Sequence, residues 1–265
     1  MSAEPQVVEL RALAESVARA AGSLIEDRAG SLVDVSTKST GTDMVTEVDR
    51  ASEALITERL LAARPHDAIL GEEGVDIVGT SDVRWVVDPL DGTTNFLYDF
   101  PGYNVAIAAQ VSGQTVAAAV YDVVRGELFS AATGAGARLD GRPIRVADQV
   151  DLGQALVGTG FSYDARRRRA QAEVLLEVLP LVRDVRRQGA AALDLCSVAC
   201  GRLDAFYERG LAPWDVGAGG LIALEAGAVL DVTHDAGGTA AVVAAAPGIA
   251  AALGDLLART AFASA

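Results

Sequence analysis

The sequence predicts a mixed α/β protein in which helices and sheets stack in layers, and three observations support this fold class. Apolar runs typical of strands gather in the first half of the chain. In the second half such runs alternate with segments of helical period, which is typical of sheets covered by helices. The chain has 265 residues, of which 51% are hydrophobic and 22% are charged. That composition excludes disordered, collagen-like and coiled-coil proteins.

The first half is expected to begin with two amphipathic helices, over 9–27 and 48–64, with a polar loop over 36–43 between them. An antiparallel meander should follow, because short apolar runs are separated by turn residues such as Ser112-Gly113. A further hairpin turn is expected at Asp140-Gly141. The strands predicted in this half cover 68–70, 85–87, 103–110, 115–121 and 127–132.

The second half is expected to alternate strands with helices. Its predicted strands cover 155–161, 203–208, 229–233 and 241–246, and its predicted helices cover 165–178, 191–200, 215–226 and 248–259. The sequence shows no low-complexity linker between the halves. We therefore expect an N-terminal half over 1–148 and a C-terminal half over 149–265, packed as one compact unit.

Acidic residues outnumber basic ones in this chain. It carries 36 Asp and Glu against 22 Lys and Arg, which gives a formal net charge of −14. Such a surface repels nucleic acid phosphates and anionic membranes, so binding to either is disfavoured. If the substrate is itself an anion, a cation must mediate, and the many carboxylates could hold a divalent metal ion for that purpose.

Neither the cysteines nor the apolar segments indicate an extracellular or membrane protein. Cys196 and Cys200 lie four positions apart in a predicted helix, and we expect core residues rather than a redox or metal pair. The N-terminal segment lacks the uninterrupted apolar stretch of a signal peptide. The uncharged stretch 236–254 is mostly Ala and Gly and contains Pro247-Gly248, so no transmembrane helix is predicted. We expect a cytoplasmic protein.

The densest chemical signal is the octapeptide DPLDGTTN, residues 88–95, directly after a predicted strand. Pro and Gly are expected to end the strand here, so that Asp88 and Asp91 can converge on one cation together with a backbone carbonyl between them. Gly92 and Thr93 are expected to open a helix, where free N–H groups attract phosphate. An Asx turn followed by a helix cap would explain the same residues without any function.

Three other acidic residues occupy positions from which carboxylates could join this group. Glu72 follows an apolar strand, and the adjacent glutamates there repel each other unless a cation neutralises one. Asp215 follows Pro213-Trp214 at the expected start of a helix, and Asp49 lies near the start of another. Each also has an ordinary structural explanation, which is a solvated turn for the glutamate and a helix cap for the aspartates.

Together, the segments GEE, DPLDGTTN and PWDVGAGG resemble the inositol monophosphatase family of metal-dependent sugar phosphatases in their order and separation. The resemblance extends from about Lys38 to the last strands. It implies an αβαβα layered sandwich of the sugar-phosphatase type, dependence on Mg²⁺, a homodimer and frequent inhibition by Li⁺. The metal ligands that it implies are Glu72, Asp88, the Leu90 carbonyl, Asp91 and Asp215.

The resemblance also implies the remaining roles. Asp49 and Thr93 match the pair that orients the attacking water next to Glu72, and Lys38 matches the lysine of a mobile loop that closes over the metals. The residues implied for substrate binding are Gly92, Thr93, Gly189, Ala190, Ala191, Glu208 and Asp215. Hard oxygen donors suit two or three Mg²⁺ ions, and Mn²⁺ nearly as well. No phosphoenzyme is then needed, because one ion can activate water while another stabilises the leaving oxygen.

We therefore predict a Mg²⁺-dependent phosphatase of small phosphorylated polyols that acts above all on myo-inositol 1-phosphate. Ala190 stands where many members of the family carry a hydroxyl residue, which removes one hydrogen bond to the ring hydroxyls. Histidinol phosphate and fructose 1,6-bisphosphate are therefore alternative substrates. A non-enzymatic alternative is a protein that binds RNA or a transcription complex, which the run Arg166–Arg169 would support. A solvated helix face explains that run more simply, and the acidic balance disfavours nucleic acid.

Overall fold

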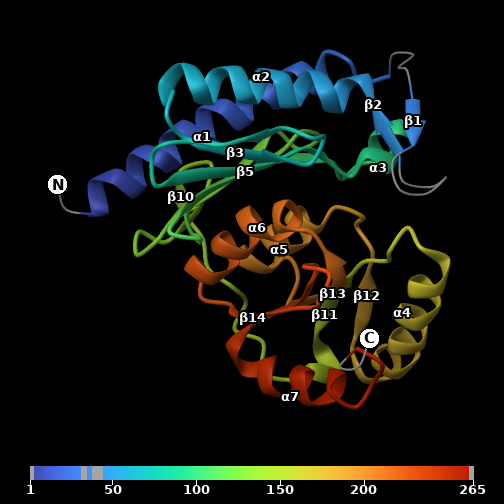
Figure 1. Ribbon diagram of the computed structural model, residues 1–265. Coiled ribbons are helices and arrows are strands. Elements are labelled where there is room, and N and C mark those ends of the chain that lie inside the picture. Colours follow the sequence, from blue (N-terminus) through green and yellow to red (C-terminus); the bar gives the residue numbers. More distant parts are fainter. Residues whose placement is uncertain (1–2, 31–34, 38–43, 263–265) are drawn as a thin grey trace.

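The computed structural model describes residues 3–30, 35–37 and 44–262, and it confirms the mixed α/β fold. Figure 1 shows the layers in the order helix, sheet, helix, sheet, helix, with α1 and α2 on one outer face and α4 and α7 toward the other. The helices are α1 (Ala3–Glu26), α2 (Glu47–Ala63), α3 (Thr93–Leu97), α4 (Ala165–Val178), α5 (Ala191–Ala199), α6 (Pro213–Glu225) and α7 (Pro247–Leu257).

An eight-stranded sheet forms the first sheet layer, a five-stranded sheet forms the second, and two strands pair separately. In spatial order, the large sheet consists of β10 (Arg142–Pro143), β9 (Ala137–Leu139), β8 (Glu127–Ala132), β7 (Gln114–Asp122), β6 (Asn104–Val111), β5 (Val83–Asp91), β3 (Ala68–Gly71) and β4 (Asp76–Ile77). The smaller sheet consists of β12 (Asp184–Arg186), β11 (Leu156–Thr159), β13 (Ala205–Leu211), β15 (Ala240–Ala245) and β14 (Val229–His234). The separate pair consists of β1 (Val35–Thr37) and β2 (Met44–Thr46).

The central strands of the large sheet are covered on both faces. Trp85 and Val87 of β5 point into a core with α1 and α2, whereas Val86 between them points into a second core with α5 and α6. Ile107 and Ala108 of β6 divide between the same two cores. Because both faces are buried, these strands are apolar along their length, and polar groups gather where the strands end.

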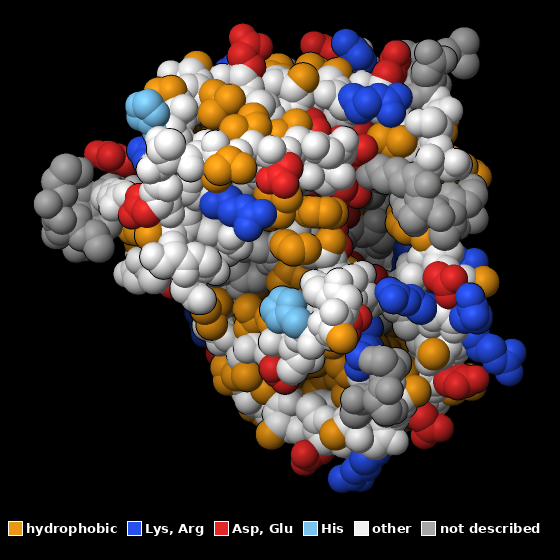
Figure 2. All heavy atoms as spheres, in the orientation of Figure 1, with side chains coloured by type: hydrophobic (Ala, Val, Ile, Leu, Met, Phe, Trp, Pro, Cys, Tyr) orange, Lys and Arg blue, Asp and Glu red, His pale blue; other side chains and the backbone are white. Residues whose placement is uncertain are grey.

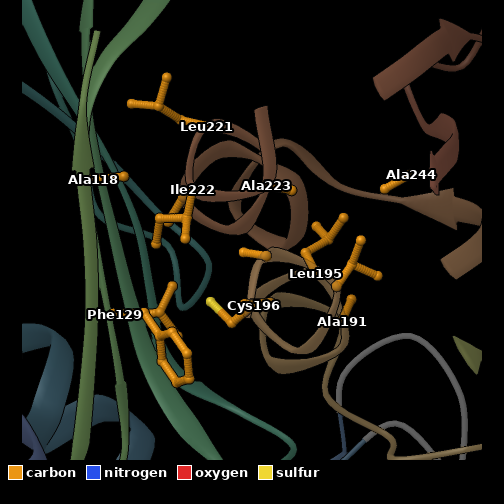
Figure 3. Packing of buried hydrophobic residues seen from close by; sticks show 14 of the residues in the cluster. Ala118, Phe129, Ala191, Leu195, Cys196, Leu221, Ile222, Ala223 and Ala244 are labelled. Carbon is orange, nitrogen blue, oxygen red and sulfur yellow. The ribbon is translucent and has the colours of Figure 1, made fainter. Parts of the chain in front are cut away.

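Helices α5 and α6 form the middle layer and pack against both sheets. Figure 3 shows Cys196 of α5 and Ile222 of α6 on the side of these helices that faces Phe129 of the large sheet. Gly219 lets the two helices approach closely, because a Cβ at this position would lie 2.8 Å from the Cβ of Leu195. Cys196 is a fully buried free cysteine, which confirms that it is a core residue.

The two sheets draw on separate parts of the chain. The strands of the large sheet lie between residues 68 and 143, and those of the smaller sheet between 156 and 245. The core around α5 and α6 contains residues from both parts. The two halves therefore share one core, and a division of the chain near residue 148 stays a proposal. None of the helices in the described ranges is long and apolar enough to cross a bilayer.

Some local expectations from the sequence are wrong. Ser36 and Thr37 belong to β1 rather than to a loop, and 38–43 lie outside the described residues. The strand β5 does not end before Asp88, because its pairing with β6 resumes at Asp91 after a register shift. The shift carries the strand past Pro89, which has no N–H to donate to the ladder. The strands β4 and β12 were not expected, since two or three residues show no period.

Candidate active site

A cavity of about 510 Å³ lies between the two sheets, where β5 ends and α3, α5 and α6 begin. Figure 2 shows a hollow between the half of the molecule that carries α1 and α2 and the half that carries α4 and α7. The predicted site residues on its wall are Glu72, Asp88, Leu90, Asp91, Gly92, Thr93, Gly189, Ala190, Ala191, Glu208 and Asp215. Residues separated by more than a hundred positions in the sequence therefore meet in one pocket.

Two predicted residues do not line this cavity. Asp49 lies directly behind Thr93, within hydrogen-bond distance of it. Lys38 lies outside the described residues, so its place stays a prediction.

Three residues of the DPLDGTTN segment are fixed by the end of β5. Leu90 N donates to Asp88 Oδ1 over 3.1 Å, which turns the Asp88 carboxylate back along its own segment. Asp91 Oδ2 accepts hydrogen bonds from Asn104 Nδ2 (2.9 Å) and from the backbone N–H of Ala192 (3.0 Å). Asp91 is thus held from both sides of the cavity, by β6 and by the first turn of α5.

The other two acidic residues are positioned by backbone geometry. Glu72 follows β3, and its N–H donates to Val87 O over 3.2 Å, so the turn after β3 stays attached to β5. Asp215 is the third residue of α6, and its Oδ2 accepts from the N–H of Ala212 over 2.7 Å. Asp215 therefore caps its helix, as the simpler explanation of the sequence proposed, and it also lines the cavity.

Burial and mutual repulsion raise the pKa values of three of these acids. Burial is the main cause at Asp88, whose pKa lies well above its usual range, and the charges of Glu72, Asp91 and Asp215 raise it further. Burial raises the pKa of Asp91 to about 6, although the hydrogen bond from Asn104 lowers it. The pKa of Asp215 is also well above its usual range, through burial and then through Glu72 and Asp91. A cation among these carboxylates would relieve the repulsion.

The donor set fits a hard divalent cation. It consists of carboxylate oxygens and the Leu90 carbonyl, and the cavity wall has no His or Cys among its described residues. The acidic side chains are not arranged as a complete metal site. In the described ranges, no group of three or more acidic, His or Cys side chains is positioned to hold a metal ion. The donors Glu72, Asp88, Asp91 and Asp215 would therefore have to close further around an ion.

Asp49 and Thr93 form a buried pair next to the carboxylates. Thr93 Oγ1 donates to Asp49 Oδ1 over 2.9 Å, and it lies 3.1 Å from Leu90 O. The other carboxylate oxygen of Asp49 accepts from the N–H of Thr46 over 2.8 Å in a capping box at the start of α2. Burial raises the pKa of Asp49, and its hydrogen bonds oppose that rise. Because the Thr93 proton is directed at Asp49, the lone pairs of the hydroxyl are free to accept a hydrogen bond from a water in the cavity.

Gly92 must be glycine at the point where the cavity meets α3. Its φ is +87°, and a Cβ there would lie 2.7 Å from Gly102 O. The left-handed conformation turns the chain from β5 into α3 within one residue. The N–H groups of Gly92 and Thr93 are thereby placed at the beginning of α3, on the wall that also carries Asp91.

The side of the cavity opposite the large sheet is less acidic. It is formed by Gly189, Ala190 and Ala191 at the start of α5 and by Glu208 of β13. Burial raises the pKa of Glu208 to about 8, although the nearby Arg187 lowers it. Small side chains leave room there for a substrate, and Glu208 offers a hydrogen-bonding group at its edge.

Glu208 gives a prediction about pH. A carboxyl group with a folded-state pKa of about 8 and an ordinary value of 4.5 stabilises the fold while it is protonated, and this contribution is lost as the pH rises between those values. A difference of one between the folded and unfolded pKa corresponds to about 1.4 kcal/mol, so the metal-free protein should lose a few kcal/mol of unfolding free energy over this range. Glu208→Gln should flatten the dependence. Urea denaturation in EDTA at a series of pH values measures it, and identical pH dependence in both proteins would contradict the assignment.

Several residues of the site were not predicted from the sequence. Asn104 holds Asp91, and Ser52 of α2 donates through its hydroxyl to Pro89 O over 2.8 Å. Arg167 and Arg209 stand on the cavity wall opposite the acidic cluster. The signal for Asn104 was present, because it is a polar residue at the start of an apolar strand. Ser52 and Arg209 had no comparable signal, whereas Arg167 belongs to the run Arg166–Arg169, for which a solvated helix face was the simpler expectation.

Asn104→Ala should weaken metal binding. The substitution removes the donor that keeps Asp91 Oδ2 in place over 2.9 Å. Losing a group that orients a metal ligand typically costs about 10- to 100-fold in metal affinity or activity. Titration of activity with divalent metal should show half-saturation at a correspondingly higher concentration. An unchanged metal dependence in a folded variant would show that Asp91 needs no such support.

Comparisons with known proteins agree with this geometry. A sequence model of the inositol monophosphatase family matches residues 6–263. The chain is 52% identical over 262 residues to the inositol-1-monophosphatase of Mycobacterium bovis, which covers 91% of this chain and 90% of that protein. It is 41% identical over 222 residues to the Nus factor SuhB of Escherichia coli, over 82% and 83% of the two chains. The solved structure of Mycobacterium tuberculosis SuhB matches with a TM-score of 0.82 and 47% identity, over 95% of this chain and 96% of that one.

Proposed function

Because the chain belongs to the inositol monophosphatase family and is therefore a phosphatase, we propose that it hydrolyses myo-inositol 1-phosphate to inositol and phosphate with the help of Mg²⁺. One observation carries this proposal. A single cavity of about 510 Å³ joins the acidic cluster to the Thr93 hydroxyl and to a wall of small residues. The cluster suits metal ions that bind phosphate, and the small residues leave space for a polyol ring.

The acidic cluster is the proposed metal site. Glu72, Asp88, the Leu90 carbonyl, Asp91 and Asp215 would hold two or three Mg²⁺ ions, with Mn²⁺ as a substitute. When bound, such ions supply positive charge that activates a water and stabilises the leaving oxygen. Lys38 is proposed to close over this site.

The Thr93 hydroxyl is proposed to orient the attacking water. It donates its own proton to Asp49, so it can only accept a hydrogen bond from the water, and the oxygen lone pairs of the water are left to face the phosphorus. Glu72, which lies on the same cavity wall as Thr93, is proposed to take part in catalysis together with Thr93 and Asp49. The N–H groups of Gly92 and Thr93 would donate to phosphate oxygens as charge builds on them.

The polyol would lie against Gly189, Ala190, Ala191 and Glu208. Glu208 can hydrogen-bond a ring hydroxyl in either protonation state, because a carboxylate accepts from a hydroxyl and a carboxylic acid can also donate to it. Asp215, at the start of α6, would contact the substrate near the ester oxygen that joins the phosphate to the polyol. Ala190 offers no hydroxyl, so the polyol depends on fewer polar contacts than a serine or threonine would give.

A panel of phosphate esters tests the proposal. We expect the highest kcat/KM with myo-inositol 1-phosphate, lower values with fructose 1,6-bisphosphate and histidinol phosphate, and no turnover in EDTA until Mg²⁺ is restored. Li⁺ should inhibit. A clear preference for histidinol phosphate would overturn the substrate, and full activity in EDTA would overturn the metal.

A role in transcription is a second candidate, because one relative carries the name Nus factor. The run Arg166–Arg169 gives it limited support. Arg168 Nη1 donates to Tyr163 O over 2.9 Å, and Arg169 pairs with Glu173 at 3.4 Å, so half of the run is already engaged within the chain. RNA binding that weakens with salt and is lost when the run is changed to glutamine would favour this role.

We also propose a homodimer that works in the cytoplasm. Tyr98 and Phe100 follow α3 with 75% and 57% of their surface exposed, and neighbouring exposed apolar side chains can mark a contact between proteins. Light scattering measures the assembly. Replacing both with serine should shift a dimer toward the monomer.

A further inference from the structure

We propose that the chain has a second ligand site, which binds a small aromatic carboxylate on the face of the smaller sheet that lies away from α5 and α6. A cavity of about 320 Å³ lies there, between α4, the strands β13 and β15, and the residues Ala261 and Phe262, the last that the structure describes. Its size falls in the range of small-molecule pockets, from about 300 Å³ upward. The proposal goes beyond the phosphatase reaction and does not depend on it.

The body of this cavity is apolar and contains aromatic rings. Val174, Tyr207, Ala241 and Phe262 line it. The rings of Tyr207 and Phe262 meet edge to face, with centroids 5.7 Å apart. Arg209 holds Phe262 in place, since its guanidinium lies 5.6 Å from the ring centroid and also donates to Phe262 O. An aromatic guest can therefore stack within a preformed pocket.

A buried hydroxyl in this cavity lacks a partner. Tyr207 is 3% exposed, and its hydroxyl oxygen has no partner in hydrogen-bond geometry among the described residues, although the Thr159 side chain lies near it. The Thr159 hydroxyl beside it donates to the backbone carbonyl of Tyr207 instead, over 2.9 Å. Buried polar groups nearly always have a partner, so an unpaired hydroxyl on a cavity wall indicates a group that a ligand completes.

The mouth of the cavity carries positive charge, although the chain as a whole has a net charge of −14. The side chains of Arg166 and Arg167 form no ion pair or hydrogen bond with any described residue, unlike the two arginines that follow them. Asp235 also stands at the mouth and keeps its negative charge, since hydrogen bonds from the Thr239 hydroxyl (2.7 Å) and the N–H of Gly237 (2.9 Å), together with the charge of Arg167, favour its ionised form. The two arginines outnumber this one carboxylate, so the entrance is cationic on balance and favours a carboxylate, with Arg166 as the cation that no described carboxylate at the mouth offsets.

The second cavity shares a wall with the active-site cavity. Gly160, Arg167, Glu208, Arg209 and Gly210 line both of them. Neighbouring residues of β13 face opposite sides of the sheet, and Tyr207 lines the second cavity but not the first, whereas Glu208 and Arg209 lie at the boundary between the two. A guest beside Tyr207 would therefore be separated from the polyol pocket by one strand.

Binding of 2-naphthoate to the full-length protein in EDTA tests the proposal, with 2-naphthamide as the uncharged probe. Calorimetry should show saturable binding of the carboxylate and weaker binding of the amide. Tyr207→Phe removes the unpaired hydroxyl and should weaken binding of both probes about fivefold. Arg166→Gln should weaken binding of the carboxylate severalfold and leave binding of the amide unchanged. Arg169→Gln is the matched control, because Arg169 is paired with Glu173 and lies outside the cavity.

Ala241→Trp fills the cavity and should abolish binding of both probes while a cooperative thermal transition is kept. If that variant does not fold, Tyr207→Phe and Arg166→Gln decide the matter. No binding at millimolar 2-naphthoate, equal binding in all variants, or displacement of the probe by inositol with phosphate would each overturn the proposal. The last result would place the probe in the active site instead.

Discussion

Replacing Asp91 with asparagine is expected to lower kcat by at least about a thousandfold. Asp91 is the acidic residue to which both halves of the molecule donate hydrogen bonds, through Asn104 and the N–H of Ala192. Asparagine keeps one oxygen that can accept both bonds, but it removes the negative charge that would hold a cation. A loss of that size corresponds to roughly 4 kcal/mol of transition-state stabilisation, which is within what a bound metal ion can supply.

The same variant should fold normally and be at least as stable as the parent without metal. Burial raises the pKa of Asp91 to about 6, so its charged form opposes folding above that pH, and asparagine has no charge to bury. Steady-state kinetics at saturating Mg²⁺ and thermal unfolding in EDTA measure the two effects. Normal turnover would remove Asp91 from the metal site, and an unfolded variant would mean that its role is structural.

Thr93→Ala should lower kcat by about 100-fold or more. The substitution deletes the hydroxyl that donates to Asp49 Oδ1 over 2.9 Å and that would orient the attacking water. Correct positioning of a reacting group contributes at least this factor in enzymes. The hydroxyl positions the attacking water and not the substrate. Substrate binding, and with it KM, should therefore change little.

Thr93→Ser provides the control for that experiment. Serine keeps the hydroxyl and removes only a methyl group, so it should retain activity within about tenfold. Asp49→Asn should fall between the two variants, since Asn can still bond Thr93 but can donate to it as well as accept. If alanine and serine at position 93 lose activity equally, packing rather than the hydroxyl explains the effect.

The layered fold could be predicted because the chain repeats a simple pattern. Strands such as β6 are apolar on both sides, and the helices around them have one apolar stripe, so sheets covered by helices were the consistent solution. The site residues of the segment 88–95 were also predictable, since they lie within eight positions and follow a buried strand. Glu72 and Asp215 could be added through the resemblance carried by the segments GEE and PWDVGAGG, because a solvated turn or a helix cap would explain either acid alone.

Long-range contacts could not be predicted in the same way. The N–H of Ala192 reaches Asp91 across 101 positions, and nothing local to either residue indicates that bond. The register shift that carries β5 past Pro89 depends on its partner β6, so the strand was expected to end too early. Asp194 is a charged residue inside the apolar helix α5, which the sequence shows, yet its burial at 1% exposure emerges only when both sheets close on that helix.

The central claim is that the acidic cluster closes around divalent cations. A crystal structure grown with Mn²⁺ and inorganic phosphate tests it directly, because Mn²⁺ scatters anomalously and suits the same oxygen donors as Mg²⁺. We expect anomalous peaks bounded by the carboxylates of Glu72, Asp88, Asp91 and Asp215, with phosphate next to the N–H groups of Gly92 and Thr93. A map with phosphate in the cavity but no anomalous peak among those carboxylates would contradict the claim.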